Sequence, residues 1–230
     1  ISLANRLRSE VSDGIIAQSF SNAALDVLKQ KKNGKYVILQ GRPIPSSYKE
    51  TRTFGNFGLV QDNNDEKTTE TLILKANHSA AKPCSFNTQD LLDMQIANIV
   101  VKYAQSNAVS LVKNGTLLGV GVGQQSRIDC VGLACGKALV NSVRSSPIIK
   151  KVLDSFKKGI SRQDKINAII RYIENDFTKR EHDEWLNNFV EAVGPLSLEE
   201  RNTIRASMSN VTMASDGFLP FSDNIDLANK

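Results

Sequence analysis

The first forty residues contain two short apolar runs with an amphipathic segment between them. Residues 14–17 and 36–40 are apolar runs of strand length, and residues 21–31 between them have the apolar spacing of a helix. Asn33 and Gly34 provide a stop for that helix. The pattern predicts a β-α-β unit near the amino terminus.

The clearest helical pattern lies at residues 90–106, after a polar stretch at residues 42–87. Asn87 or Thr88 can cap its amino terminus. Its apolar stripe has three- and four-residue steps and consists of Leu92, Ile96, Ile99, Val100 and Tyr103. Within the polar stretch, the short apolar segments FGNFGLVQ (54–61) and TLILKA (71–76) are expected to pair as a hairpin.

A second hairpin is predicted where two apolar runs in AVSLVKNGTLLGVGV flank Asn114-Gly115, because this dipeptide is a strong signal for a tight β-turn. Residues 129–143 then read as a helix with small residues for close packing, namely Gly132, Ala134, Gly136 and Ala138. Residues 146–209 are largely helical, with breaks at Gly159 and Gly194-Pro195. After these helices, residues 210–224 (NVTMASDGFLPFSDN) are expected to form a strand and then a loop.

Strands that alternate with helices indicate an α/β fold class. We expect residues 1–230 to form one functional region, with an α/β core at 1–145, a helical segment at 146–209, and a return strand and binding loop at 210–230. The chain begins at Ile1 and ends in a polar, loop-like stretch, so we expect it to be a piece of a longer protein.

Composition narrows the class of protein. The chain is 40% hydrophobic and 23% charged, as is typical of a globular protein. No run reaches the roughly 18 apolar residues of a membrane span, and the start lacks the apolar core of a signal peptide, so we expect a cytoplasmic protein with no membrane partner. Three cysteines without metal-ligand spacing favour reduced structural thiols over zinc, catalytic or disulfide roles.

The net charge of +5 comes from lysine and arginine residues spread along the chain. Aromatic residues are not interleaved with them as in proteins that bind single-stranded nucleic acid. We therefore interpret the charge as a solvated surface and expect no nucleic-acid partner. His78 and His182 lie in polar or charged stretches and are interpreted as solvated side chains.

GVGVGQQSRIDC (119–130) has glycine at three alternate positions, followed by a polar cluster. The glycines either approach a phosphate or mark a strand that passes close to another backbone. The cluster at 124–127 precedes a helix whose first turn presents backbone N–H groups, which is a site for an anion. Arg127 is either part of that site or one half of a surface ion pair.

Two other polar segments are candidates for ligand binding. Gln105-Ser106-Asn107 lies between a predicted helix and a predicted strand. Residues 215–224 form a loop in which Phe218 and Phe221 flank a Leu-Pro pair. These rings either clamp a flat heterocycle or form a hydrophobic plug.

Three long segments occur in a characteristic order: VKYAQSNAVSLVKNG, GVGVGQQSRIDCVGLACGKA and SDGFLPFSDNID. Together with EVSDGIIA near the start, they resemble the transformylase part of the bifunctional AICAR transformylase and IMP cyclohydrolase family. Residues 42–87 and 146–209 match more loosely. The resemblance implies cytidine-deaminase-like α/β units and a homodimer with its active sites between subunits. It also implies formyl transfer from 10-formyltetrahydrofolate, as co-substrate, to the 5-amino group of AICAR, giving FAICAR.

The resemblance also assigns site residues. The positions that match nucleotide contacts are Asp13, Asn107, Arg127 and Phe218, of which Asn107 and Arg127 would support the transition state. The positions that match folate contacts are Ile128, Pro220, Asp223 and Asn224. A potassium ion is implied near Val101 and Asp216, although Ala108 replaces a hydroxyl-bearing residue there.

The sequence departs from the family pattern in three places. The Lys-His pair that carries the family's proton chemistry is absent from these 230 residues, so no catalytic acid or base is assigned. Ser222 stands where the family has arginine, and the family's closing segment would follow Lys230. An IMP cyclohydrolase domain would belong to the longer protein. The alternative is a catalytically inactive nucleotide-binding or dimerisation module of the same fold.

Overall fold

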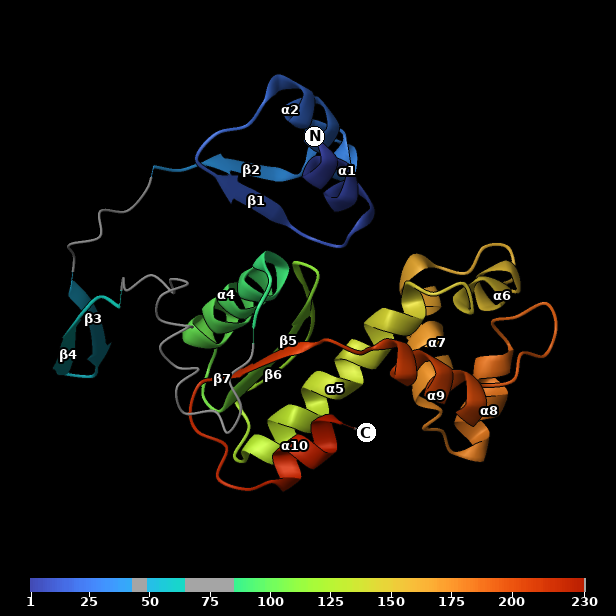
Figure 1. The fold of residues 1–230 in the computed structure, drawn as a ribbon. Coiled ribbons are helices and arrows are strands. Elements are labelled where there is room, and N and C mark those ends of the chain that lie inside the picture. Colours follow the sequence, from blue (N-terminus) through green and yellow to red (C-terminus); the bar gives the residue numbers. More distant parts are fainter. Residues whose placement is uncertain (43–48, 65–84, 230) are drawn as a thin grey trace. The chain divides into compact units, whose positions relative to one another are not determined.

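The computed structural model describes residues 1–42, 49–64 and 85–229 and is shown in Figure 1. The chain divides into two compact units, Ile1–Glu66 and Lys67–Lys230. TLILKA, His78 and Cys84 lie outside the described residues. In the described parts of the chain, we find no helix with the length and apolar character that a membrane crossing requires.

The amino-terminal unit confirms the predicted β-α-β pattern. Strands β1 (Gly14–Ala17) and β2 (Val37–Gln40) are parallel neighbours, and α2 (Asn22–Lys29) connects them. Ser21 caps α2 by accepting a hydrogen bond from the Ala24 amide. The chain leaves α2 through a short 3-10 helix, η1 (Lys31–Gly34).

A small core joins α1 (Ser2–Ser9) to this unit through Ala4, Leu28 and Tyr36. Lys31 is buried beside it, and its ammonium group donates to the carbonyls of Leu7 and Glu10 at 2.6 and 2.7 Å. Because carbonyls at a helix end lack partners within the helix, this lysine satisfies the carboxyl end of α1.

The hairpin in residues 49–62 differs from the predicted one. Strand β4 (Phe57–Asp62) pairs with the polar strand β3 (Lys49–Phe54), and the predicted partner TLILKA lies outside the described residues. The reason is the two-residue turn at Gly55-Asn56, where Gly55 has a φ of 56°. FGNFGLVQ therefore contains a turn of its own, which the apolar pattern alone did not reveal.

A three-stranded antiparallel sheet forms the centre of the second unit. Its order is β6-β5-β7, with β5 at Ala108–Lys113, β6 at Thr116–Val122 and β7 at Thr212–Ser215. Asn114 and Gly115 both have positive φ, at 51° and 71°, which confirms the predicted tight hairpin between β5 and β6.

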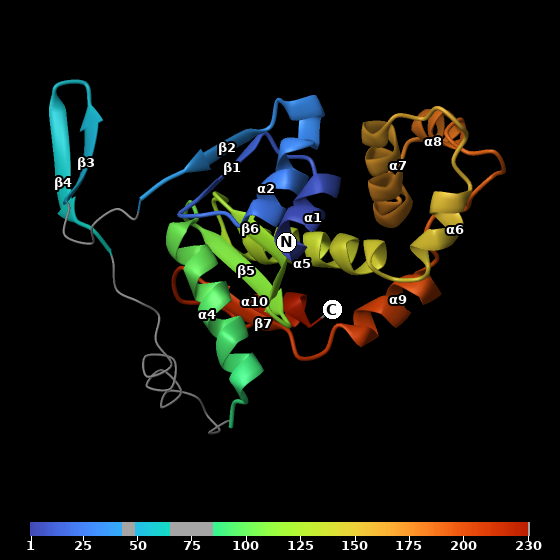
Figure 2. The same cartoon turned by 90° about the horizontal axis from the view of Figure 1, so that it is seen from above.

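Helices α4 (Thr88–Tyr103) and α5 (Arg127–Arg144) lie on opposite faces of this sheet (Figure 2). Asn87 caps α4, as predicted. The apolar stripe was a poor guide to its buried face, because Leu92, Ile99 and Tyr103 are exposed. The buried positions are Asp93, Ala97 and Val101.

Asp93 is buried because it binds the β5–β6 turn. One carboxylate oxygen accepts from the Asn114 amide at 2.7 Å, and the other accepts from the Gly115 amide at 2.6 Å and from Gln89 at 2.9 Å. This long-range role of a charged residue sets the orientation of α4, and helical periodicity cannot predict it.

The alternating glycines of β6 are positions of close backbone approach. A Cβ atom at Gly119 would overlap the carbonyl of Ala134, and one at Gly121 would overlap the backbone of Cys130. Strand β6 therefore packs directly on the backbone of α5, whose Ala134 and Ala138 are fully buried. The second interpretation of the glycines, as thin strand positions, is confirmed for these two.

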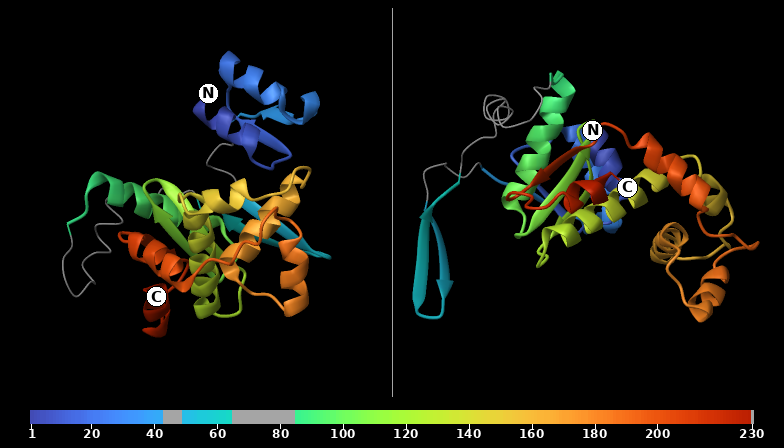
Figure 3. Two further views of the ribbon diagram at one scale, coloured as in Figure 1. Left: turned by 90° about the vertical axis from the view of Figure 1, so that its right-hand side faces the viewer. Right: turned by 60° about the horizontal axis from the view of Figure 1, so that its bottom comes forward.

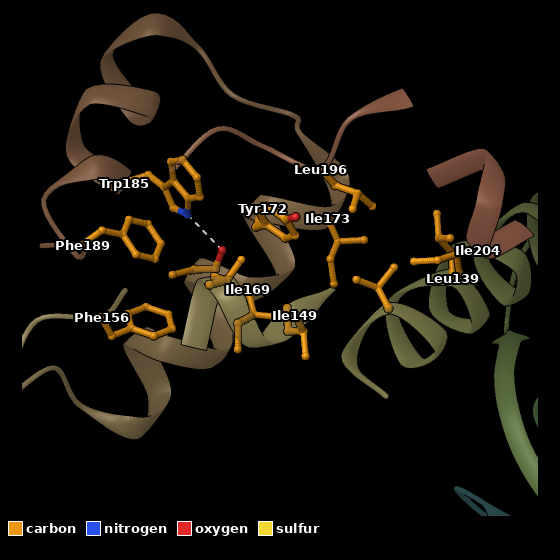
Figure 4. Packing of buried hydrophobic residues seen from close by; sticks show 13 residues of the cluster. Leu139, Ile149, Phe156, Ile169, Tyr172, Ile173, Trp185, Phe189, Leu196 and Ile204 are labelled. Carbon is orange, nitrogen blue, oxygen red and sulfur yellow. Dashed lines mark hydrogen bonds between the residues drawn. The ribbon is translucent and has the colours of Figure 1, made fainter. Parts of the chain in front are cut away.

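Helices α6–α9 gather at the carboxyl end of α5 (Figure 3), as expected for residues 146–209. They are α6 (Ile149–Asp154), α7 (Arg162–Glu174), α8 (Lys179–Leu186) and α9 (Leu198–Ser207). Their core includes Leu139 and Val143 of α5 and the only tryptophan, Trp185. The Trp185 indole donates to the Ala168 carbonyl at 2.9 Å (Figure 4).

Two local predictions in this unit were wrong. His182 packs against the rings of Phe177 and Trp185, with centroids 5.5 and 5.6 Å away, and is partly buried, so it is more than a solvated side chain. The end of the chain also contains α10 (Asp223–Ala228), which packs against α5 (Figure 1). Six residues are too few for a reliable periodic signal, so the sequence suggested a loop there.

Candidate functional site

The candidate site forms where three chain segments meet at one end of the sheet. Strand β5 starts at Ala108, which pairs with Val122 near the end of β6, and Val109 pairs with Ser215 at the end of β7. Because β5 is antiparallel to both neighbours, its first residue lies beside their last residues. The polar segments at 105–107, 124–127 and 215–217 therefore converge.

Asp216 joins these segments through its carboxylate. Oδ2 accepts a hydrogen bond from the Ser106 hydroxyl at 2.5 Å. Oδ1 accepts from the Ala108 amide at 2.9 Å and from Nη1 of Arg127 at 2.5 Å. Nη1 of Arg127 also donates to the Ser215 hydroxyl at 3.4 Å. Arg127 thus forms an ion pair, although one of the two sequence interpretations expected this pair at the surface and its side chains are mostly covered.

The Arg127–Asp216 pair is largely removed from solvent, with side chains 19% and 15% exposed. Burial by itself would raise the pKa of Asp216, but hydrogen bonds from Ser106, Ala108 and Arg127 lower that pKa below its ordinary value. The carboxylate is therefore charged at neutral pH and faces a charged guanidinium.

Asn107 fastens the start of β5 to the turn before α5. Its side-chain Nδ2 donates to the carbonyls of Gln124 and Gln125 at 2.9 and 3.2 Å. Its backbone carbonyl accepts from the Cys130 thiol at 3.0 Å. The Ser106–Asn107 peptide bond is cis. The carboxamide nitrogen is thus used within the protein, and Oδ1 is the atom that can accept from a ligand.

Helix α5 begins at Arg127 and is capped by Ser126, whose hydroxyl accepts from the Asp129 amide at 3.3 Å. Cys130 follows one turn later and is fully buried. Burial raises the pKa of the Cys130 thiol, so it is neutral at neutral pH and acts as a hydrogen-bond donor. Cys130 is thus a free, buried thiol with a structural contact.

The loop after Asp216 presents aromatic side chains to solvent. Phe218 is 81% exposed and Phe221 is 69% exposed, so they form no hydrophobic plug. Pro220 and Asp223 are also exposed, whereas Asn224 is buried in α10. Its Nδ2 donates to the Phe221 carbonyl at 3.2 Å and to Asp223 at 2.8 Å, and its Oδ1 is buried without a partner among the described residues.

The remaining predicted residues are Asp13, Ile128 and Val101. Asp13 belongs to the amino-terminal unit, is almost fully exposed, and forms an ion pair with Lys32. The hydrogen bond and charge of Lys32 lower the pKa of Asp13. Ile128 is partly buried in the first turn of α5, and Val101 is buried in α4.

The structure thus brings together Asn107 and Arg127, with Phe218 two residues beyond Asp216. Sequence reasoning missed the roles of Ser106 and Gly217 in this cluster. Gly217 has no Cβ atom to obstruct the Arg127 guanidinium, which lies against it. The sequence signal for these roles was the Asp216-Gly217 dipeptide at the end of an apolar strand. However, Arg127, which binds Asp216, lies 89 residues away in the sequence.

Comparison with known proteins identifies the chain's relatives. The family model described as the AICARFT/IMPCHase bienzyme matches residues 1–137. A bifunctional purine biosynthesis protein PurH of Corynebacterium glutamicum (strain R) is 31% identical over 162 residues, which are 68% of this chain and 30% of that protein. PurH of Parvibaculum lavamentivorans is 34% identical over 128 residues, covering 54% of this chain and 22% of its own length. The chain therefore spans less than a third of these relatives.

Proposed function

Because the chain belongs to the AICARFT/IMPCHase bienzyme family, we propose that it forms part of a formyltransferase of purine biosynthesis. The reaction transfers the formyl group of 10-formyltetrahydrofolate to the 5-amino group of AICAR and yields FAICAR and tetrahydrofolate. We assign no residue of this chain to IMP cyclohydrolase, the second activity in the family name.

The observation that carries this proposal is the convergence of Asn107, Arg127 and the Phe218 loop on Asp216. These three segments are distant in sequence, and the structure brings them to one end of the β6-β5-β7 sheet. An amide, a guanidinium and an exposed aromatic ring are suited to a nucleotide with a carboxamide-bearing heterocycle and a phosphate.

The amine of AICAR is a weak nucleophile, since the neighbouring carboxamide withdraws its electron density. Its nitrogen attacks the formyl carbon, an oxyanion forms, the amine loses a proton, and the bond from the formyl carbon to N10 of the folate breaks as N10 gains a proton. Asn107 Oδ1 would orient the amine or carboxamide. Arg127 would stabilise negative charge through Nε and Nη2, since Nη1 is bound by Asp216 and Ser215.

The proton transfer is assigned to no residue of this chain. The family's Lys-His pair is absent from the sequence, and His182 packs in the aromatic cluster of the helical group. The residues described here would therefore bind and orient the substrates and stabilise charge. Asp13 is proposed as a further nucleotide contact only because its segment, EVSDGIIA, matches the family motif.

The folate would lie on the Phe218–Asn224 side of the cluster. Phe218 offers an exposed ring for stacking, and Ile128, Pro220 and Asp223 are the other proposed contacts. Asn224 supports this placement, because its buried Oδ1 lacks a donor among the described residues and a pterin amino group is a donor.

The donor set around Asp216 does not fit a potassium ion. Three donors already occupy the carboxylate, and one of them is the positively charged guanidinium of Arg127. The Val101 carbonyl accepts the Ala104 amide at 3.3 Å. A second cation there would face electrostatic repulsion from Arg127, so no step is derived through potassium.

For the molecule as a whole, we propose cytidine-deaminase-like units, a homodimer with active sites between subunits, and a cytoplasmic location. The three-stranded sheet with a helix on each face supports the proposed fold. We treat residues 1–230 as one functional region of the longer protein.

Kinetics of the full-length gene product test the function. We expect formylation of AICAR, and about 100-fold slower turnover for Arg127→Ala because a charge-stabilising donor is lost. Arg162→Ala, an exposed change on α7, is the matched control and is expected to keep wild-type turnover. Unchanged kinetics in Arg127→Ala would remove that residue from the mechanism, and an inactive wild-type protein would contradict the enzyme itself.

A second candidate is a nucleotide-binding module without turnover. The neutralisation of Arg127 by Asp216 favours it. Tight AICAR binding by the full-length protein with no FAICAR formation, measured by calorimetry and mass spectrometry, would select this module over the enzyme.

A further inference from the structure

We propose that Asp216 is a positioning residue that fixes the Arg127 guanidinium and the Ser106–Asn107 segment in one arrangement, and that Gly217 provides the space this arrangement needs. The proposal rests on the proposed function, because the groups held in place are those assigned to AICAR. Asp216 itself acts through these groups and is not assigned a contact with the substrate.

Three chain segments depend on this one carboxylate. Oδ1 holds the Ala108 amide at 2.9 Å and Nη1 of Arg127 at 2.5 Å, while Oδ2 holds the Ser106 hydroxyl at 2.5 Å. Ser106 directly precedes Asn107, whose side chain binds the turn before Arg127. The result is a closed loop of contacts from Arg127 through Asp216 and Asn107 back to the turn.

Such a loop restricts both substrate-directed groups together. A guanidinium bound on Nη1 cannot rotate freely, so the directions of its Nε and Nη2 donors are set before a ligand arrives. With both side chains less than one-fifth exposed, water competes weakly for the ion pair. Preorganised donors of this kind lower the barrier because they need no reorientation in the transition state.

Gly217 contributes by lacking a side chain. A Cβ atom at this position would lie 3.1 Å from Cζ of Arg127 and closer still to Nη2. The φ angle of Gly217 lies outside the left-handed region, so alanine can adopt this backbone. Gly217→Ala therefore displaces the guanidinium without removing a charge or straining the chain.

Two variants separate charge from shape. Asp216→Asn keeps the size of the side chain and removes its charge, and Gly217→Ala keeps the charge and moves the guanidinium. For both we expect kcat for AICAR formylation to fall about tenfold to 100-fold, with the KM for 10-formyltetrahydrofolate unchanged. Asp226→Asn, an exposed carboxylate on α10, and Gly136→Ala, whose added methyl meets open space, are the matched controls with wild-type kcat.

The decisive comparison uses the Arg127→Ala background. If Gly217 acts by positioning Arg127, then Gly217→Ala does not lower kcat further once Arg127 is gone. Asp216→Asn then lowers kcat less than it does in the wild-type background, because only its contacts with Ser106 and Ala108 remain to be lost. A merely structural role predicts losses that multiply with that of Arg127→Ala. Multiplied losses, or wild-type kcat in Gly217→Ala, would overturn the proposal, and thermal unfolding confirms that each variant is folded.

A spectroscopic measurement keeps the proposal testable if the full-length protein proves inactive. The Nε–H signal of Arg127 in ¹⁵N NMR spectra is expected to be resolved and slow to exchange with solvent. Asp216→Asn and Gly217→Ala should broaden or shift it, while Asp226→Asn should leave it unchanged. If the protein does not formylate AICAR but shows these NMR changes, the proposed function is refuted and the positioning role stands. If the Arg127 signal of the wild-type protein is that of a mobile side chain, the positioning role is refuted.

Discussion

At the residue scale, some side chains of the candidate site were identified by sequence motifs. The contacts that hold these side chains together could not be identified in that way. Asn107 and Arg127 were singled out by their polar segments, and the structure brings both into one cluster. The central position of Asp216 depends on pairing across roughly a hundred residues, so local patterns carried no sign of it. The alternating glycines proved to be structural at Gly119 and Gly121.

Gly121→Ala is expected to lower the free energy of unfolding by about 1–3 kcal/mol, because the new methyl group overlaps the backbone of Cys130. Gly136→Ala on α5 is the control. Its methyl group has no atom within 4 Å, and alanine favours a helix over glycine by about 1 kcal/mol. Urea denaturation of the two variants measures the difference, and equal stabilities would contradict the close approach of β6 and α5.

The lowered pKa of Asp216 predicts a pH dependence of stability. Above 3.8, its ordinary value, the carboxylate is charged in both the folded and the unfolded chain, so its stabilising contribution is fully present. As the pH falls below 3.8, the unfolded chain takes up the proton first and the contribution declines, until it is lost below the folded pKa. The stability difference between wild type and Asp216→Asn should therefore shrink over that range in urea titrations. A difference independent of pH would contradict the ion pair.

At the element scale, the sequence predicted most of the regular structure. The parallel β1-α2-β2 unit, the β5–β6 hairpin and helices α4 and α5 were all anticipated from periodicity, caps and turn residues. The errors came where tertiary contacts override the pattern. Helix α4 buries Asp93 in place of Leu92, and α10 is too short to have a clear period.

Asp93→Ala is expected to destabilise the second unit by about 1–3 kcal/mol, because the hydrogen bonds from the Asn114 and Gly115 amides to a charged acceptor are lost. Asp93→Asn retains one acceptor oxygen and should lose less. Equilibrium unfolding of both variants checks this order. If the alanine variant is as stable as wild type, the carboxylate does not hold the β5–β6 turn.

At the scale of the whole molecule, α5 joins two cores in the second unit. Its amino-terminal half contributes Cys130, Val131 and Ala134 to the core under the sheet. Its carboxyl-terminal half contributes Leu139 and Val143 to the core of the helical group (Figure 4). The sequence suggested a helical segment at 146–209, but no local pattern showed that one helix would link the two.

This shared helix predicts that the two cores unfold together. Trp185 fluorescence reports on the helical group, and the reactivity of Cys130 reports on the sheet core when Cys84 and Cys135 are replaced by serine. We expect the two signals to change at the same urea concentration. Two separate midpoints would show that α5 does not couple the cores.

We propose that Asn107, Arg127 and the Phe218 loop form the nucleotide site of a formyltransferase. Calorimetric titration of AICAR into the full-length protein tests it most directly. We predict saturable binding that Arg127→Ala weakens about tenfold or more, as expected when a charge-assisted contact worth about 1.5–3 kcal/mol is lost, and that Arg162→Ala leaves unchanged. Absence of AICAR binding by the wild-type protein, or equal affinities in the two variants, would contradict the claim.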